Sequence, residues 1–333
     1  MAVSLIRSKV SIGALKKNKT VRTFFKQIWQ TQREQIGYKF TKKKFKPALS
    51  NAFRLLLGDE KLAACALLVD VGSFSEPEKY PGLAHFLEHM IFMGSEKYPT
   101  ENAFDAHIKK CGGFDNAHTE SEETVFYFEV SEEHLDSSMD YFSALLMKPL
   151  MKKEAMTRER DAVESEFQQT LHDDEARRDQ LLASLATKSF PHATFAWGNN
   201  KSLKEQIESD DELHKVLHEF RKKHYSSHRM YLCVQARLPI DELESMVVKH
   251  FSGIDNSKEK IDDFSGFSYK QAFCEEFHNE IFFVKPVENV CKLELTWVLP
   301  PMAKLYKCKP DQFLSYLIGY EGEGSLCAYL RKR

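Results

Sequence analysis

The stretch Gly82-Leu-Ala-His-Phe-Leu-Glu-His-Met-Ile-Phe-Met93 decides the fold and the chemistry that we expect of this chain. It follows Pro81 and is stopped by Gly94, which predicts a single helix with a defined start and end. At 100° per residue, His85 and His89 lie on one face of that helix, one turn apart. Two imidazoles in this arrangement can bind one metal ion at about 2.0–2.1 Å.

Glu88 falls on the same side of the predicted helix, where it can reach a metal-bound water without binding the metal itself. The order His-x-x-Glu-His is the inverzincin motif. A bare histidine pair four residues apart is common by chance, but the full pattern in an apolar helix favours a metal site over a buried structural pair. A catalytic zinc also needs a third protein ligand and an open position for water.

The charged helix predicted around residues 158–166 offers carboxylates for that third position. Two of them, Glu159 and Glu166, are seven residues apart and lie within about 20° of one face. Glu164 lies about 160° from Glu166 on the same helix. A helix this charged is typical of a solvated surface, and spacing does not choose among its acids, which are Glu159, Asp161, Glu164 and Glu166.

The rest of the pattern predicts a layered α+β fold. Apolar or β-branched runs predict strands at 62–71, 124–130 and 229–237. Helical patterns cover 102–110, 131–147, 153–188, 203–222 and 240–250. Because strands and helices do not alternate one for one, a layered α+β domain is favoured over a doubly wound sheet.

Charge and composition exclude several classes of protein. Residues 1–50 hold 13 Lys and Arg and one acid, Glu34, so 34 basic and 48 acidic side chains remain in 51–333, a net charge of −14. This acidic body argues against nucleic-acid binding and suits a basic substrate. No apolar run approaches the roughly 20 residues of a membrane span.

The cysteines and the basic residues near the N-terminus indicate in which cellular compartment the protein is located. The seven cysteines are scattered and contain no Cys-x-x-Cys pair, which is typical of reduced thiols in an intracellular protein. We therefore expect a cytoplasmic location. Residues 1–30 are rich in Lys and Arg and lack acids, so a mitochondrial transit peptide is the alternative to a disordered basic extension.

Long motifs in this sequence resemble the pitrilysin–insulysin–nardilysin family of zinc metallopeptidases. The resemblance covers about 50–330 and its details, such as Tyr320-Glu-Gly-Glu-Gly-Ser-Leu326, are nearest the nardilysin branch. The long acidic insertion typical of that branch, between the first strand and the zinc helix, is missing. The matching stretches are Val71-Gly-Ser-Phe74, His85 to Ser95, Lys97-Tyr-Pro99, Gly113-Phe-Asp-Asn-Ala117, Ala162-Val-Glu-Ser-Glu166 and Trp197-Gly-Asn199.

The resemblance implies a role for each matching residue. His85, His89 and Glu166 would bind one Zn²⁺ per chain, with Glu88 as the general base that activates a zinc-bound water. Glu159 would support the site from outside the ligand set. Asn116 and Ala117 match the edge segment to which the family adds substrate as an extra strand.

The resemblance also implies the domain organisation, since the family repeats one layered α+β unit four times. A strand at 292–299 and a helix at 311–322 repeat the order of 62–94 without its histidines. We therefore expect one complete repeat and the start of a second. The expected parts are a basic extension at 1–45 (disordered or targeting), a zinc-binding peptidase domain at 46–255, a linker at 256–272 and a truncated second homologous domain without zinc ligands at 273–333.

The function expected from these features is zinc-dependent endopeptidase activity at basic or dibasic sites of peptide substrates. One alternative is a truncated, non-proteolytic module that binds zinc and peptide, because the family needs a second half to complete its substrate chamber. That half would be a C-terminal extension or a second chain. A protein similar to mitochondrial processing peptidase is the other alternative, suggested by the basic start.

Overall fold

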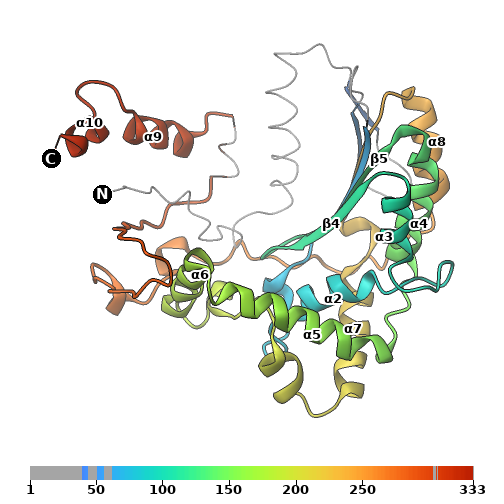
Figure 1. The fold of residues 1–333 in the computed structure, drawn as a ribbon, viewed down its shortest axis with the longest axis horizontal. Helices are drawn as coiled ribbons and strands as arrows, with labels where there is room; N and C mark the ends of the chain where they lie inside the picture. Colours follow the sequence, from blue (N-terminus) through green and yellow to red (C-terminus); the bar gives the residue numbers. More distant parts are fainter. Residues whose placement is uncertain (1–39, 44–50, 56–61, 303–304, 306, 333) are drawn as a thin grey trace. The chain divides into compact units, whose positions relative to one another are not determined.

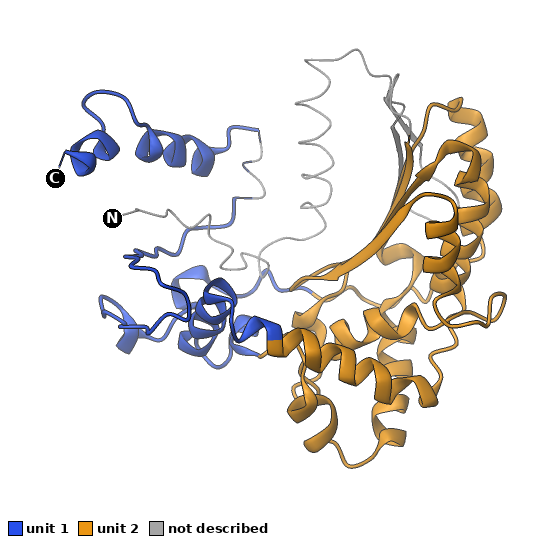
Figure 2. Ribbon diagram, viewed as in Figure 1, with its two compact units in different colours: residues 1–30, 169–194, 263–333 blue, residues 31–168, 195–262 orange. Residues whose placement is uncertain are grey.

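The computed structural model describes residues 40–43, 51–55, 62–302, 305 and 307–332 (Figure 1). Most of the basic extension, with its expected disorder or targeting role, lies outside these residues. The chain divides into two compact units, residues 31–168 with 195–262 and residues 1–30 with 169–194 and 263–333 (Figure 2). The larger unit, 31–168 with 195–262, contains the whole histidine motif.

A six-stranded mixed sheet forms the centre of the larger unit, in the order β1-β2-β6-β3-β5-β4. Among the strands that the structure describes, β2 and β6 pair in parallel and the other neighbours pair in antiparallel fashion. Sheet and helices together confirm the expected α+β fold. The strands are β1 Phe40–Lys43, β2 Asn51–Leu55, β3 Leu62–Val69, β4 Phe114–Thr119, β5 Thr124–Ser131 and β6 Met230–Gln235.

Amphipathic helices cover this sheet and complete its core. Figure 1 shows α3, α4 and α8 along one face of the sheet. Their aromatic side chains Phe104, Phe142 and Phe251 are buried with Phe126 and Phe128 of β5, so apolar burial holds the layers together. The helices of this unit are α2 Leu83–Ile91, α3 Ala103–Lys110, α4 Leu135–Met147, α5 Lys153–Thr170, α7 Asp210–His224 and α8 Ile240–Phe251.

Helix α2 begins where Pro81 and Gly82 predict it. Gly82 adopts φ +89°, and a Cβ there would lie 2.2 Å from Gly198 Cα, so glycine is required. The Glu76 carboxylate accepts hydrogen bonds from the amides of Gly82, at 2.8 Å, and Ala84, at 2.7 Å. These bonds satisfy amides at the helix start that have no partner within the helix, and they fix its position.

In the part of the chain before β6, the structure differs from the expected elements in three places. Strand β4 was not expected from the pattern, and the helix expected at 153–188 is two helices, α5 and α6 (Asp174–Leu185). The break occurs because the Asp173 side chain accepts hydrogen bonds from the amides of Glu175 and Ala176 and so starts a new helix. The third, the helix expected at 203–222, begins only at Asp210 as α7, where the Ser209 hydroxyl caps it.

The smaller unit contains α6 and two short helices, α9 Pro310–Gly319 and α10 Leu326–Arg331. Helix α9 confirms the helix expected there, but the strand expected at 292–299 is wrong. Residues 292–299 form no strand, and Leu295 and Trp297 are exposed. An extended segment becomes a strand only when a neighbour pairs with several of its residues, and within 292–299 the pairing is limited to a single bridge at Leu293.

None of the described helices is both long and apolar enough to cross a membrane.

In the larger unit, the fully buried Arg229 directly precedes β6 and contacts residues at the end of that unit. Its guanidinium lies 3.5 Å from Asp262 Oδ2 and 2.9 Å from His224 Nδ1, and it donates to the Lys260 carbonyl. The Ser75 hydroxyl donates to the same Asp262 carboxylate at 2.9 Å. These contacts hold residues 260–262 against the segment that precedes α2.

Replacing Arg229 with Met should lower the free energy of unfolding by about 3 kcal/mol, because Asp262 and the Lys260 carbonyl lose a charged partner that is itself fully buried. Urea unfolding followed by circular dichroism measures the change. Arg237→Met removes an exposed arginine whose Nε lies 3.7 Å from Glu132 and should cost less than about 1 kcal/mol. Equal losses in the two variants would contradict the role given to Arg229.

Candidate metal centre

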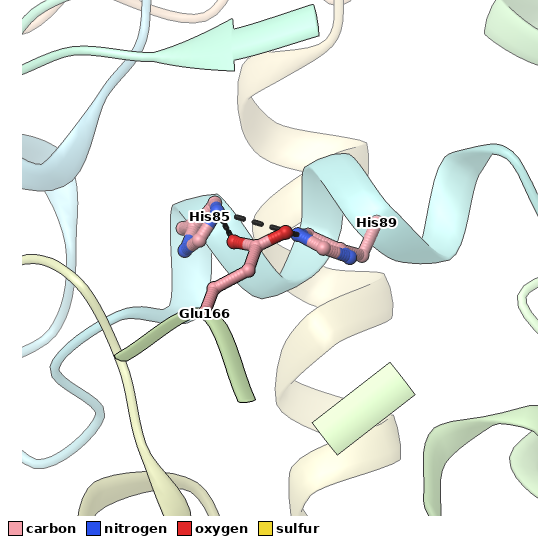
Figure 3. Close-up of side chains that lie close together, drawn as sticks. All are labelled: His85, His89 and Glu166. Carbon is pink, nitrogen blue, oxygen red and sulfur yellow. Dashed lines mark hydrogen bonds and ion pairs between the residues drawn. The ribbon is translucent and has the colours of Figure 1, made fainter. Parts of the chain in front are cut away.

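The two histidines of α2 and one carboxylate of α5 converge on a single point (Figure 3). His85 Nε2 and His89 Nε2 lie 3.3 Å apart. Glu166 places Oε2 at 3.4 Å from His85 Nε2 and Oε1 at 3.6 Å from His89 Nε2. The structure thus brings the three expected ligands together.

The donor set fits a zinc ion. Ligands about 2.0–2.1 Å from a tetrahedral ion lie about 3.3 Å from one another, close to the three distances here. Two imidazole nitrogens and one carboxylate oxygen are donors that zinc accepts, and three protein ligands leave a position for water. Of the four acids that the sequence left open, only Glu166 joins both histidines, whereas Glu164 accepts from the Asn200 amide at 2.6 Å.

Each histidine is held by a second contact on its other ring nitrogen. His85 Nδ1 donates to the Trp197 carbonyl at 2.6 Å, and His89 Nδ1 lies 3.5 Å from Glu159 Oε2. Such contacts turn Nε2 toward the metal and make the ring more basic. Glu159 therefore lies where the resemblance implies. The contact of His85 with the Trp197 carbonyl was not predicted, because every residue has a backbone carbonyl and the sequence does not show which one will accept.

Opposite charges dominate the electrostatics of the metal-free centre. The hydrogen bonds of Glu166 with His85 and His89 lower the pKa of its carboxyl to about 2. Burial alone would lower the pKa of His89, but the bonds with Glu159 and Glu166 outweigh it and raise this pKa to about 9. At neutral pH the metal-free centre therefore holds an imidazolium at His89 beside the Glu166 carboxylate, so a metal ion would have to displace a proton to bind.

Zinc affinity should consequently rise with pH up to about 9, by about tenfold per pH unit for one displaced proton. Glu166 stays ionised throughout this range and adds no slope. Competition with a chelator of known affinity at several pH values between about 6 and 9 measures the trend. A zinc affinity that does not change with pH would contradict the protonated state given to His89.

Glu88 projects from the same helix but takes no part in the triad. Its side chain is 7% exposed, and its Oε2 accepts a hydrogen bond of 2.5 Å from the Thr119 hydroxyl. Burial raises the pKa of this carboxyl, and the Thr119 bond partly counters that effect. The arrangement leaves a carboxylate beside the metal position and free of the ligand set. Thr119 was not expected, because a lone threonine at a strand end carries no chemical signature.

Asn116 and Ala117 both lie on β4, at the edge of the sheet. Among the described strands, β4 pairs only with β5, where Asn116 is opposite Tyr127 and Ala117 is opposite Phe126. Helix α2 packs against β4. The edge that could accept an extended peptide is thus the strand that contacts the histidine helix.

Comparison with known proteins shows the family of this chain. A family model described as Insulinase (Peptidase family M16) matches residues 58–194, and a second, Peptidase M16 inactive domain, matches 213–333. The chain belongs to the insulinase family of peptidases. The motif resemblance is confirmed, and so is its nardilysin-like character.

This chain aligns with only part of the length of its relatives in the insulinase family. Nardilysin of Homo sapiens is 42% identical over 275 residues, which are 82% of this chain and 24% of the relative. Insulin-degrading enzyme of Drosophila melanogaster is 35% identical, over 85% of this chain and 29% of the relative. The chain thus spans about a quarter of the length of these curated relatives.

A solved structure supports the fold independently of close sequence similarity. The crystal structure of pitrilysin aligns with a TM-score of 0.71 and 24% identity, over 90% of this chain and 31% of that one. The insulinase-family fold assigned from the sequence is therefore the fold of this chain.

Proposed function

We propose that this chain acts as a zinc-dependent metalloendopeptidase. The observation that carries the proposal is the convergence of His85, His89 and Glu166 beside a fourth, non-ligating carboxylate, Glu88. A structural zinc site uses four protein ligands, whereas three ligands with an adjacent base are typical of a hydrolytic site.

Different residues of this chain have different roles in the proposed hydrolysis. His85, His89 and Glu166 would hold the metal, which when bound supplies a Lewis acid that acidifies water and polarises a carbonyl. Glu88 takes a proton from the attacking water and delivers it to the leaving amine. The Trp197 carbonyl and Glu159 keep both imidazoles in place. The β4 edge offers backbone groups to an extended peptide.

The substrates we propose are peptides with basic or dibasic sites. The net charge of −14 over residues 51–333 attracts cationic peptides. Relatives named for peptides, such as the A-factor-processing enzyme of Saccharomyces cerevisiae, at 38% identity, support a peptide as the substrate class.

Cleavage of a quenched peptide with a central Lys-Arg pair tests both parts of the proposal. The matched control peptide carries Gln-Gln instead, and each is incubated with the zinc-loaded chain and with the chain after chelation. We expect zinc-dependent cleavage next to the basic pair, identified by mass spectrometry, and slower cleavage of the neutral peptide. Equal rates for the two peptides would remove the basic preference. No zinc-dependent cleavage of either would remove the peptidase function.

A non-proteolytic module that binds zinc and peptide is the second candidate, favoured by the match of residues 213–333 to a domain described as inactive. In that case zinc and peptide bind but no product forms. A C-terminal half or a second chain would then complete the site, and cleavage would begin only when that part is added.

For location we propose the cytoplasm, since the cysteines are free and scattered. A fusion of residues 1–50 to a fluorescent reporter tests the mitochondrial alternative. Diffuse fluorescence is expected, and import into mitochondria would contradict a cytoplasmic location and favour a role like that of mitochondrial processing peptidase.

A further inference from the structure

The carboxylate of Glu88 accepts a hydrogen bond from a residue that lies outside the proposed ligand set. The Thr119 hydroxyl donates to Glu88 Oε2 at 2.5 Å. Thr119 is the last residue of β4 and faces α2, whereas the neighbouring His118 side chain lies against Tyr127 of β5. The contact therefore joins the edge strand to the helix that carries the histidines.

We propose that Thr119 is a positioning residue for Glu88, which holds the carboxylate in the orientation that faces the substrate-side water. The inference rests on the proposed peptidase function and deepens it. The hydrogen bond fixes the position of Oε2 and so sets the direction of the other carboxylate oxygen, Oε1, which can then accept a hydrogen bond from the water.

The end of β4 is held rigidly enough for this task. Thr119 is opposite Thr124 in the β4–β5 register, and the Thr124 hydroxyl donates to the Val71 carbonyl at 2.9 Å. The amide of Ser73 donates to the Glu120 carbonyl at 3.1 Å. The turn after β4 is thus tied to the segment that leads into α2, and the Thr119 hydroxyl has a fixed place from which to reach Glu88.

The same strand carries Asn116 and Ala117, where an extended peptide would add to the edge. A peptide bound along β4 would therefore lie on the strand that also holds the base. Losing the Thr119 hydroxyl should leave the peptide-binding edge intact and affect the chemical step. The expected signature is a lower kcat with little change in KM.

Three variants test the assignment in turnover. Thr119→Val removes the hydroxyl and keeps the shape, and it should lower kcat about 10- to 100-fold, the effect of losing a hydrogen bond to a charged group. Thr119→Ser keeps the hydroxyl and should restore kcat to within about threefold. Thr187→Val is the matched control, because it removes a threonine hydroxyl that donates to the Gln271 carbonyl and not to Glu88. A Thr119→Val chain that matches Thr187→Val in kcat would overturn the proposal.

A binding measurement decides the question without turnover. A peptide hydroxamate binds zinc and shares a hydrogen bond with the adjacent carboxylate, so its affinity reports the position of Glu88. Calorimetry should show that Thr119→Val weakens binding about tenfold in the wild-type background and has no further effect in Glu88→Ala. The same loss in both backgrounds would overturn the proposal. A wild-type chain that binds the hydroxamate but cleaves nothing would instead contradict the peptidase function alone.

Discussion

Glu88→Gln is expected to lower kcat by about 10²- to 10⁴-fold while the chain keeps one zinc. The substitution keeps the size of the side chain and its contact with Thr119 but removes the group that accepts a proton. Because Glu88 is not among the three ligands, zinc binding should stay the same. Initial rates of peptide cleavage and the zinc content of the same samples measure both quantities.

Glu96→Gln is the matched control for this substitution. Glu96 lies in the segment after α2, is exposed and pairs with Lys148 at 2.9 Å. It belongs to none of the contacts that we assign to the metal centre. Its removal should leave kcat within about twofold, since exposed ion pairs contribute little. Full activity in Glu88→Gln would show that another group takes the proton.

The second large effect is expected at Glu166. Glu166→Gln removes the carboxylate that lies 3.4 Å and 3.6 Å from the two histidines and that we propose as the anionic ligand. The zinc affinity should fall by more than about 100-fold, because the loss of a ligand exceeds the 10- to 100-fold typical of an outer partner. Glu159→Gln removes such an outer partner of His89 and should give a loss within that smaller range.

Glu164→Gln controls for the change of charge on the same helix. Its carboxylate accepts from the Asn200 amide and from Gln168 and does not join the histidines. Zinc affinity in this variant should stay within about threefold of the wild type. Chelator competition at one pH ranks all three variants. A Glu164 variant that loses zinc as strongly as the Glu166 variant would contradict the ligand set.

The histidine helix could be predicted from sequence because its determinants are local. The apolar period, the glycine at each end and the histidine spacing all lie within residues 82–94. Strand β4 could not, since Phe-Asp-Asn-Ala-His-Thr is mostly polar and becomes a strand only by pairing with β5. The opposite error at 292–299 has the same cause, because an apolar alternating segment forms a strand only when several of its residues pair, and here a single bridge at Leu293 is formed.

The candidate site shows the same limit. His85 and His89 could be paired from spacing alone. Glu166, however, lies on a separate helix, where it is one of four acids among which spacing does not choose. Only the packing of α5 beside α2 brings it to both imidazoles. The Trp197 carbonyl and the Thr119 hydroxyl are set entirely by tertiary structure.

A zinc titration of the metal-free chain, with bound zinc and peptide cleavage followed in the same samples, tests the central claim most directly. The account predicts that cleavage of the Lys-Arg peptide rises in proportion to bound zinc and stops rising at one equivalent. Binding of one equivalent with no cleavage, or cleavage that does not depend on zinc, would contradict it.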